Sequence, residues 1–290
     1  MKIGFIGQGW IGRHYADDFE KRGFDVVRYA LETEYAHNKD AIALCDIVFI
    51  AVPTPTTEKG FDDSIVRTVI RTVGEGKIAV IKSTIVPGTT ESIQNENPNV
   101  FVLHSPEFLV EATAAYDAAH PNRNIVGIPI DNDVYREKAN TVLSVLPDAP
   151  YTTVMRARDA EFVKYAGNNY LFTKVMYMNM LYDLVHAMGG DWENIKEAVS
   201  HDPRIGKSHM EPVHKGGRGA GGHCFIKDFE AYRRMYDTLV SDPYGSAVLH
   251  AEAELNIHLL VKSKKDLDLL RGVYGDHPQL NTSSPNHVLH

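Results

Sequence analysis

The chain has 290 residues, which is long enough for two domains and a large core. Its 43% hydrophobic and 23% charged residues are typical of a soluble globular protein, and the formal net charge of -8 argues against non-specific binding of nucleic acid. No apolar run is long enough to cross a bilayer, and the first residues lack the features of a signal peptide. Two cysteines, Cys45 and Cys224, make no disulfide framework. We therefore expect a cytoplasmic protein without nucleic-acid or membrane partners, in which a thiol stays reduced.

The chain begins with a dinucleotide-binding fingerprint in its proper context. Residues 2–6 predict a short apolar strand, the sequence GQGWIG follows at 7–12, and a helical pattern continues to Lys21. The first glycine permits a tight turn, the second lets a pyrophosphate approach the backbone, and the third lets the helix pack on the strand. Because the helix N-terminus also attracts the pyrophosphate charge, the expected cofactor contacts are Gly7, Gly9, Trp10, Ile11 and Gly12.

The end of the second predicted strand, residues 25–29, bears on the choice between NAD and NADP. An acid that binds the adenosine ribose normally stands there, but the aligned position is Ala30. Glu32 is close enough to take that role. Arg28 points away along the strand and makes a poor site for a 2′-phosphate. The sequence therefore favours NAD, with Glu32 at the ribose.

Strands and helices alternate through the first half of the chain. The predicted strands cover residues 46–52, 77–82, 99–103 and 124–128, and the predicted helices cover residues 65–73 and 133–146. This alternation predicts a doubly wound, parallel, Rossmann-like sheet. Ligands bind at the carboxyl ends of such strands, so further cofactor contacts are expected from Val52, Pro53, Thr54 and Thr84.

Two acids, Glu107 and Glu111, are spaced four residues apart after the strand at 99–103. On a helix they would share a face, and their repulsion would raise the pKa of at least one carboxyl. The alternative is an acidic helix start that the helix dipole stabilises.

Residues 157–188 contain no proline and predict one helix of about 30 residues, roughly 45 Å long. Its apolar positions recur at spacings of three, four or seven: Val163, Ala166, Tyr170, Tyr177, Leu181 and Leu184. Such a helix is longer than one small domain needs, so we expect it to join two domains and to offer a homodimer face. Lys164 and Asn168 lie one turn apart, off this stripe. They are either solvated or, aimed into a cleft, donors to a developing oxyanion.

A glycine-rich stretch at 216–222 precedes Cys224. Its glycines allow positive φ, so successive N–H groups could converge on an oxyanion or a phosphate. The following residues predict a helix, whose N-terminus would lower the pKa of the Cys224 thiol. Asp228 lies one turn further on, on the same face. The alternative is a flexible turn before a helix with a buried, inert cysteine.

Three more helices are expected in the remaining sequence, at residues 192–199, 229–239 and 245–271. The predicted domains are an NAD-binding domain at 1–156 and a small all-α domain, which begins with the long helix, at 157–272. Residues 273–290 are polar and predict a tail.

Taken together, these motifs resemble the UDP-glucose/GDP-mannose 6-dehydrogenase family. The matching stretches occur in the family's order over residues 1–271: Gly7-x-Gly9-x-x-Gly12, Val52-Pro53-Thr54-Pro55-Thr56, Lys82-Ser83-Thr84, Pro106-Glu107-Phe108-Leu109-x-Glu111, Glu161-x-x-Lys164-Tyr165-x-x-Asn168, Arg204-Ile205-Gly206 and Gly221-Gly222-x-Cys224-x-x-Lys227-Asp228. The resemblance implies oxidation of a primary alcohol of a sugar nucleotide or related anionic sugar to a carboxylate, with two NAD reduced in turn. It also implies a thiohemiacetal and then a thioester on Cys224, and a place in polysaccharide biosynthesis.

The resemblance also implies a role for each matching residue. In the implied catalytic set, Cys224 is the nucleophile, and Lys164 and Asn168 donate to the oxyanion. Asp228, Glu111 and Thr84 position or activate water, and Glu107 is a supporting acid. Lys227 is implied as a further cofactor contact. The implied substrate contacts are Phe108, Leu109, Gly221, Gly222 and Arg204, the last reaching the site of the neighbouring subunit in a dimer.

The sequence departs from the family in three places. No second alternating β-α pattern follows residue 262, where family members usually carry an α/β domain that binds the nucleotide of the substrate. We therefore expect a smaller substrate, a domain supplied by a partner, or a chain cut short. The stretch from Arg204 to Cys224 is also longer than usual, and Met180 replaces an acid.

Two alternatives remain open. The chain could be a two-electron hydroxyacid dehydrogenase that uses Lys164 alone, or a non-catalytic NAD-binding protein. A metal site from His209, His214, His223 and Cys224 fits no common zinc spacing, so we expect no metal.

Overall fold

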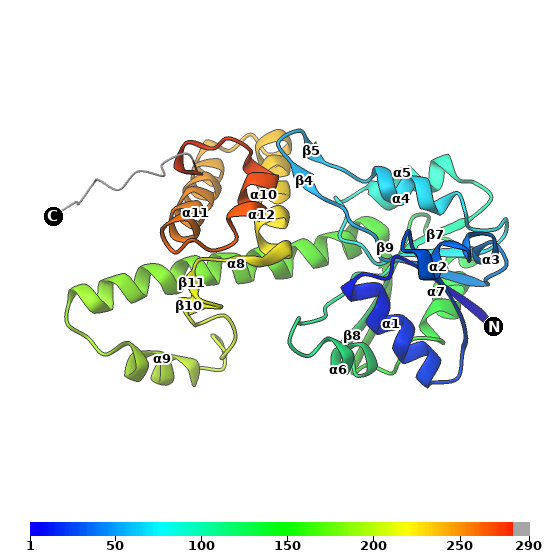
Figure 1. Cartoon of the computed structure of the whole chain (residues 1–290), viewed down its shortest axis with the longest axis horizontal. Coiled ribbons are helices and arrows are strands. Elements are labelled where there is room, and N and C mark those ends of the chain that lie inside the picture. The colour runs from blue at the N-terminus through cyan, green and yellow to red at the C-terminus, as the bar shows by residue number, and fades with distance from the viewer. Residues whose placement is uncertain (281–290) are drawn as a thin grey trace. The chain divides into compact units, whose positions relative to one another are not determined.

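The computed structural model describes residues 1–280 and divides into two compact units (Figure 1). The first unit comprises Met1–Thr54 and Asp62–Lys164, and the second comprises Pro55–Phe61 and the residues from Tyr165 onward. The sequence placed this boundary at residue 156. It lies further on because the start of the long helix packs against the sheet of the first unit. A Cβ added to Gly127 in that sheet would lie 2.7 Å from the Cα of Ala157.

A seven-stranded sheet forms the centre of the first unit, in the order β2-β1-β3-β6-β7-β8-β9. Its strands are β1 (Lys2–Ile6), β2 (Asp25–Tyr29), β3 (Ile47–Ile50), β6 (Ile78–Ile81), β7 (Phe101–His104), β8 (Arg123–Ile128) and β9 (Tyr151–Arg156). The five strands from β2 to β7 are parallel, but β8 pairs with β7 in the antiparallel direction and β9 follows β8 in parallel. The predicted fold class is confirmed, whereas the expectation of a sheet that is parallel throughout is wrong for β8 and β9.

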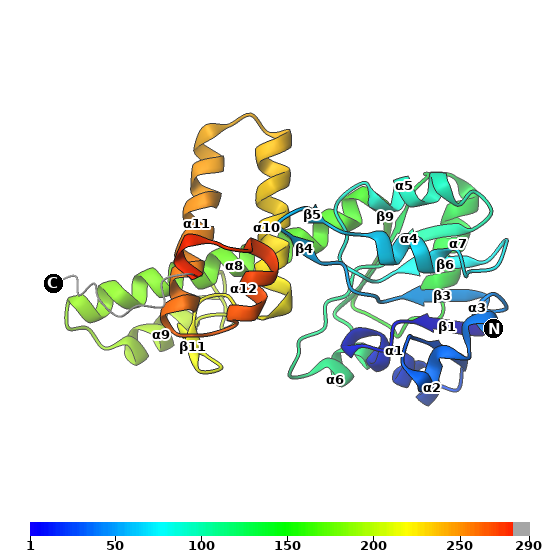
Figure 2. The same ribbon diagram turned by 45° about the horizontal axis from the view of Figure 1, so that its top comes forward.

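Helices cover both faces of this sheet, as Figures 1 and 2 show. Their bounds are α1 (Trp10–Lys21), α2 (Thr33–Ala36), α3 (Lys39–Ile42), α4 (Ser64–Ile70), α5 (Thr89–Glu96), α6 (Ala114–Ala119) and α7 (Asp133–Leu143). Side chains of α1, α6 and α7 share one core cluster with the central strands. Within that cluster the rings of Phe5, Phe19 and Phe49 lie 5.2–5.3 Å apart. This packing fixes the glycine turn between β1 and α1 against the sheet.

The second unit is mostly helical. Its elements are α8 (Ala157–Ala187, which begins in the first unit), α9 (Trp192–Ser200), α10 (Gly222–Leu239), α11 (Pro243–Lys262), α12 (Leu267–Tyr274), the 3-10 helix η1 (Pro278–Leu280), and the hairpins β4–β5 (Thr56–Thr57, Gly60–Phe61) and β10–β11 (Val213–His214, Gly217–Arg218). The helix predicted over 245–271 is two helices, because the chain turns at Lys264 and Asp266, both at positive φ. Among the helices of residues 1–280, none has the length and apolar character needed to cross a membrane.

Two sets of contacts organise the second unit. The stacked rings of Phe172 and Phe229 join α8 to α10, with centroids 3.8 Å apart. The guanidinium of Arg234 donates to the backbone carbonyls of Thr57 and Glu58, which explains why the β4–β5 hairpin belongs to this unit. The predicted tail begins inside α12 at Val273, which is buried, and the part from residue 281 lies outside the described residues.

Candidate functional site

The turn between β1 and α1 has the geometry that a dinucleotide needs. Gly7 lies at φ +90, where a Cβ would meet the carbonyl oxygen of Ala51 at 2.3 Å. A Cβ on Gly12 would lie 1.9 Å from the carbonyl oxygen of Gly7, so only glycine allows the helix this close to the strand. A Cβ on Gly9 would meet nothing within 4 Å, which leaves the backbone open to a ligand.

The N-terminus of α1 has no partner of its own. Within residues 1–280, the N–H groups of Gly9, Trp10 and Ile11 donate to no side chain, and the first turn carries no acid. Trp10 is 40% exposed, whereas Ile11 packs partly into the core. Open N–H groups at the positive end of a helix suit the pyrophosphate of a dinucleotide, so the residues present fit the cofactor expected from the sequence.

The residues at the end of β2 are consistent with binding of NAD in preference to NADP. Ala30 is buried and Glu32 is exposed two residues beyond it. Arg28 is held by the carboxylates of Asp17 and Glu20 on α1, at 2.7 and 2.8 Å. Because both acids already neutralise this guanidinium, it is not available for a 2′-phosphate. The role of Glu32 at the ribose stays a prediction.

The loops after β3 and β6 are joined to each other by hydroxyl groups. Ser83 Oγ donates to the carbonyl of Val52 at 2.7 Å and accepts from its N–H at 3.0 Å. Thr54 Oγ1 donates to the carbonyl of Thr84 at 2.7 Å. Thr54 and Thr84 are buried, and Pro53 is exposed. The residues predicted at the carboxyl ends of these strands therefore lie together at one edge of the sheet.

Glu107 and Lys164 form a buried ion pair in the first unit. Lys164 Nζ donates to Glu107 Oε1 at 2.7 Å, and the N–H of Leu109 donates to Glu107 Oε2 at 2.8 Å. Lys164 is 6% exposed and Glu107 is 3% exposed. Such a pair fixes an ammonium in place, and breaking it would strand a buried charge.

The expectation that Glu107 and Glu111 share a helix face is wrong. Residues 105–110 have no regular secondary structure, so the spacing of four residues does not bring the two acids together. Glu107 turns inward to Lys164, whereas Glu111 is exposed in the following turn. Phe108 packs its ring under the guanidinium of Arg123, at 3.8 Å from the ring centroid.

The sequence interpretation missed the part played by Glu161, one turn before Lys164 on α8. This fully buried carboxylate accepts hydrogen bonds from the N–H groups of Gly88 and Thr90 and from the Thr90 hydroxyl, at the start of α5. Burial raises the pKa of Glu161 to about 7. It links α8 to the helix that follows the Thr84 loop. Only its place in the motif with Lys164 could have drawn attention to it.

In the second unit, Cys224 is the third residue of α10 and is exposed. The prediction of a cysteine at a helix N-terminus is confirmed. Asp228 lies one turn further on and is 1% exposed. It accepts a hydrogen bond from Asn168 Nδ2 at 2.6 Å and pairs with the ammonium of Lys227. The carboxylate thus joins α10 to α8 at the amide of Asn168, one turn beyond Lys164 on the same helix.

The glycine loop before Cys224 is not an open nest. The N–H groups of three of its residues donate to side chains from α11 and the turn that follows it: Arg218 to Ser263, Ala220 to Asn256, and Gly222 to Asp266. A Cβ on Gly221 would lie 2.0 Å from Asp266 Oδ2. The expected convergence of N–H groups on an oxyanion is therefore wrong for these three groups, since the glycines serve close packing instead.

Arg204 is exposed and pairs with Asp202 in its own loop, at 2.6 Å. Its expected reach to another subunit stays a prediction, as do the substrate contacts of Phe108, Leu109, Gly221 and Gly222. Within residues 1–280 no three or more His, Cys, Asp or Glu side chains are grouped to hold a metal.

The doubly wound sheet and its uncapped glycine turn define the first unit as a dinucleotide-binding domain of the dehydrogenase type. Residues 28–142 match the NAD binding domain of the UDP-glucose/GDP-mannose dehydrogenase family, and residues 158–256 match its central domain. The chain belongs to this family, which confirms both the resemblance and NAD as the cofactor.

Individual relatives support the same assignment. A putative UDP-glucose 6-dehydrogenase of Bacillus subtilis is 32% identical over 67% of this chain and 46% of its own length. The structure of a UDP-glucose dehydrogenase from Pyrobaculum islandicum matches 93% of this chain and 70% of its own, with a TM-score of 0.75 and 28% identity. A Mycobacterium tuberculosis 3-hydroxyisobutyrate dehydrogenase shares the fold at 16% identity, with a TM-score of 0.68 over 94% of this chain and 98% of its own. The chain spans about half the length of several curated relatives that it matches.

Proposed function

We propose that this chain oxidises the primary alcohol of a nucleotide sugar, or of a related anionic sugar, to a carboxylate in two steps through a covalent intermediate on Cys224. The observation that carries the proposal is the cysteine in the first turn of α10, followed one turn later by Asp228 bonded to Asn168. NAD, when bound at the first unit, accepts the hydride in each of the two oxidations. Several curated relatives of similar sequence carry the name UDP-glucose 6-dehydrogenase.

The residues of the chain divide the chemistry among them. After the first oxidation, the Cys224 sulfur bonds to the carbonyl carbon, and the carbonyl oxygen becomes the oxyanion of a thiohemiacetal. Lys164 and Asn168 donate hydrogen bonds to this oxyanion, and Glu107 holds the Lys164 ammonium in place. The second oxidation removes hydride from the same carbon and leaves a thioester.

Hydrolysis completes the proposed reaction. Asp228, with Thr84 and Glu111, positions the water that attacks the thioester. The carbon–sulfur bond breaks, the product leaves as a carboxylate, and Cys224 is restored as a thiol. Because the mechanism needs a reduced thiol in every turnover, we place the protein in a reducing compartment such as the cytoplasm.

The stoichiometry of NADH tests this proposal. With UDP-glucose as the first substrate to try, the intact chain should yield two NADH per substrate consumed. Cys224→Ser should stop at the aldehyde or slow carboxylate formation by about a thousandfold or more. Cys45→Ser is the matched control, since Cys45 is fully buried in the first unit and takes no part in the reaction.

A second candidate is a two-electron dehydrogenase that uses Lys164 without the cysteine. The 3-hydroxyisobutyrate dehydrogenase structure shares its fold with this chain over nearly the full length of both, so the fold is compatible with that alternative. It predicts one NADH per substrate and a Cys224→Ser variant with unchanged turnover. Either result would overturn the four-electron proposal.

We also propose that α8 supplies a homodimer face. Four of its large apolar side chains lie along one stripe and are 51–63% exposed: Tyr170, Tyr177, Met180 and Leu184. A charge placed in the centre of such a face should prevent association. Tyr177→Glu should therefore give a particle of 32.4 kDa by light scattering, where the parent chain gives twice that mass. Tyr244→Glu, at an exposed tyrosine on α11, should leave the dimer intact, and a monomeric parent chain would refute the proposal.

A further inference from the structure

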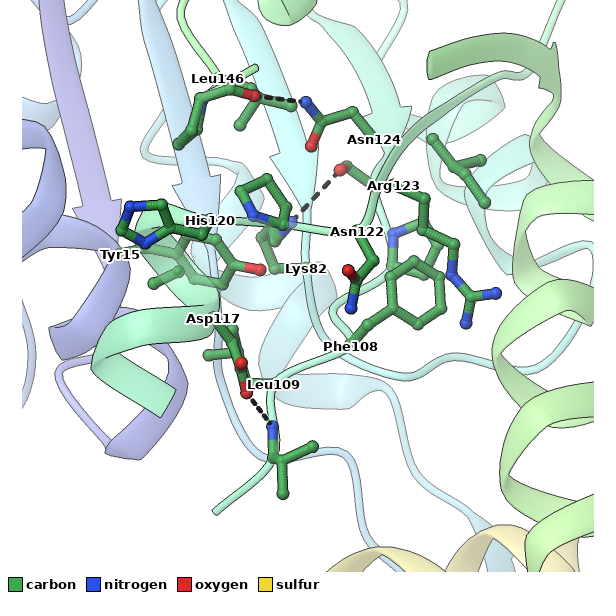
Figure 3. Close-up of a pocket in the computed structure, with 17 residues that line it drawn as sticks. Tyr15, Lys82, Phe108, Leu109, Asp117, His120, Asn122, Arg123, Asn124 and Leu146 are labelled. Carbon is green, nitrogen blue, oxygen red and sulfur yellow. Dashed lines mark hydrogen bonds between the residues drawn. The ribbon is translucent and has the colours of Figure 1, made fainter. Parts of the chain in front are cut away.

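A small cavity lies in the first unit, beneath the loop that follows β7 (Figure 3). Its volume is about 70 Å³, more than twice the ~30 Å³ that a water molecule occupies in the liquid. This space admits a small anion such as a carboxylate or a tetrahedral oxyanion. Eight polar residues line it, from α1, α6, β8 and the intervening loops: Tyr15, Lys82, Ser105, Asp117, His120, Asn122, Arg123 and Asn124.

The ammonium of Lys82 is the most unusual group in this cavity. Lys82 is 4% exposed, and its Nζ donates to Ser105 Oγ at 3.2 Å and lies 4.4 Å from the ring centroid of Tyr15. Within residues 1–280 no carboxylate lies within 4 Å of it. The nearby Glu107 already accepts from Lys164 and from the N–H of Leu109.

This arrangement leaves a buried ammonium without a carboxylate in direct contact, and Glu107 acts on it only from a greater distance. An ammonium has three donors, and Ser105 uses only one of them. Burial lowers the pKa of Lys82 to about 8, so the group is still largely protonated at pH 7. A buried charge without an ion-pair partner in direct contact is costly. An anionic occupant would remove that cost.

The other charges of the lining leave a positive excess. Arg123 is exposed at the mouth, its guanidinium lies over the ring of Phe108, and no carboxylate pairs with it among the described residues. The lining contains one carboxylate, Asp117, whose Oδ2 already accepts from the N–H of Val110 and the hydroxyl of Thr113. Two cations therefore face one acid that is already engaged.

We propose that this cavity is an oxyanion site, in which Lys82 and Arg123 bind a phosphate or carboxylate group. The group arrives either as a free ion or as part of a larger molecule that enters past the exposed side chains of Asn122 and Arg123. Phe108 and Leu109 of the implied substrate contacts also line this cavity, but Cys224, Lys164, Asn168 and Asp228 do not, so binding of an anion here can be tested without the cysteine chemistry.

Sulfate is the probe, because its charge does not change between pH 7 and 10. We expect sulfate, compared with chloride at equal ionic strength, to bind the intact chain by calorimetry and to raise its melting temperature. Lys82→Met and Arg123→Gln should each weaken the affinity at least tenfold. Arg123 is exposed, so its variant folds even if the loss of Lys82 disturbs the core. Lys77→Met removes a lysine at the opposite end of the same strand and should bind sulfate like the parent.

The pH dependence gives a second readout. The titratable and charged groups around Lys82 are Tyr15, His104, Glu107, Asp117, His120, Arg123 and Lys164. Burial raises the pKa of Tyr15 and lowers that of His104 to about 3, so neither changes charge between pH 8 and 9.5. Sulfate affinity should therefore fall about tenfold per pH unit in this range as Lys82 loses its proton.

The outcomes distinguish the source of the anion. Competition between sulfate and UDP-glucose would show that a group of the larger ligand occupies the site, and simultaneous binding would show that a free ion does. An equal response to sulfate from the parent chain, Lys82→Met and Arg123→Gln would overturn the proposal, since it would reflect only the general stabilising effect of this salt.

Discussion

Two glycine-rich turns precede helices in this chain, and they differ in whether their backbone N–H groups donate to side chains. Before α1, the N–H groups of Gly9, Trp10 and Ile11 donate to no side chain within the described residues, 1–280. Before α10, the N–H groups of Ala220 and Gly222 are bonded to Asn256 and Asp266. The first turn is therefore open for a ligand, whereas the second is fastened to its own unit.

The comparison shows that glycine content alone does not define an anion site. In the first turn glycine allows a close approach of helix to strand and leaves the neighbouring N–H groups open. In the second turn glycine allows a close approach to Asp266. Any chemistry near this turn must then come from the side chain of Cys224, because these backbone N–H groups are already bonded. Substitutions in the two turns, and of the α11 side chain Asn256 that holds the second turn, should separate these uses.

Gly12→Ala should have the largest effect. Its Cβ would lie 1.9 Å from the backbone oxygen of Gly7, which no rotamer change can relieve. We expect the free energy of unfolding to fall by about 3 kcal/mol or more, measured by denaturant titration of the intact chain. Stability within about 0.5 kcal/mol of the parent would show that the turn can accommodate a Cβ at this position.

Asn256→Leu should remove the side-chain hydrogen bonds that α11 makes to the second turn. The amide accepts from Ala220 N–H at 2.7 Å and donates to the Ala220 carbonyl at 3.1 Å, and the side chain is 2% exposed. Removing it leaves two buried backbone groups unpaired, at a cost of about 2–3 kcal/mol. Thermal unfolding checks this value. If the variant is as stable as the parent, the loop is not held by this residue.

Gly221→Ala should cost about 1–2 kcal/mol, because the obstacle is a side chain that can move. The new Cβ would lie 2.0 Å from Asp266 Oδ2. Asp266→Gly removes that oxygen and relieves a residue at φ +54, at the expense of the bond to Gly222 N–H. The double variant should therefore lose less than the sum of the two single losses. Strict additivity would mean that the two residues do not interact.

Gly9→Ala should have the smallest effect on stability, below about 0.5 kcal/mol, since its Cβ would meet nothing within 4 Å. We nevertheless expect NAD to bind at least tenfold more weakly by calorimetry, because the methyl group occupies the space that the pyrophosphate needs. Unchanged NAD affinity would remove this turn from the cofactor site. Gly9→Ala should thus lower the affinity for NAD, whereas Gly12→Ala should lower the free energy of unfolding, although both glycines belong to one motif.

The first turn could be predicted from the sequence because its rule is local. A strand, three glycines at fixed spacing and a helix lie within about 20 residues, and the closest contact, between Gly12 and the carbonyl of Gly7, falls within that span. The apolar strands were predictable for the same reason, and β1 and β2 have the predicted bounds. The edge strand β9 was missed because its exposed side chains do not form an apolar run.

The second turn could not be predicted, because its partners lie 36 to 45 residues further along the chain. Nothing in a glycine-rich stretch shows which distant side chains will accept its N–H groups. The same holds for Glu107, whose partner Lys164 lies 57 residues away. The spacing to Glu111 suggested a local, helical pair instead. Cys224 and Asp228 were placed correctly because both lie in α10 and obey its period.

The central claim is a covalent bond between Cys224 and the substrate carbon, and mass spectrometry tests it most directly. Asp228→Asn should slow the hydrolysis, so that acid quenching after mixing with UDP-glucose and NAD traps the intermediate. The account predicts an acyl group on the tryptic peptide of residues 219–227, which contains Cys224, and none on the peptide of residues 40–59, which contains Cys45. An unmodified Cys224 peptide, while the intact chain still yields two NADH and a carboxylate, would contradict it.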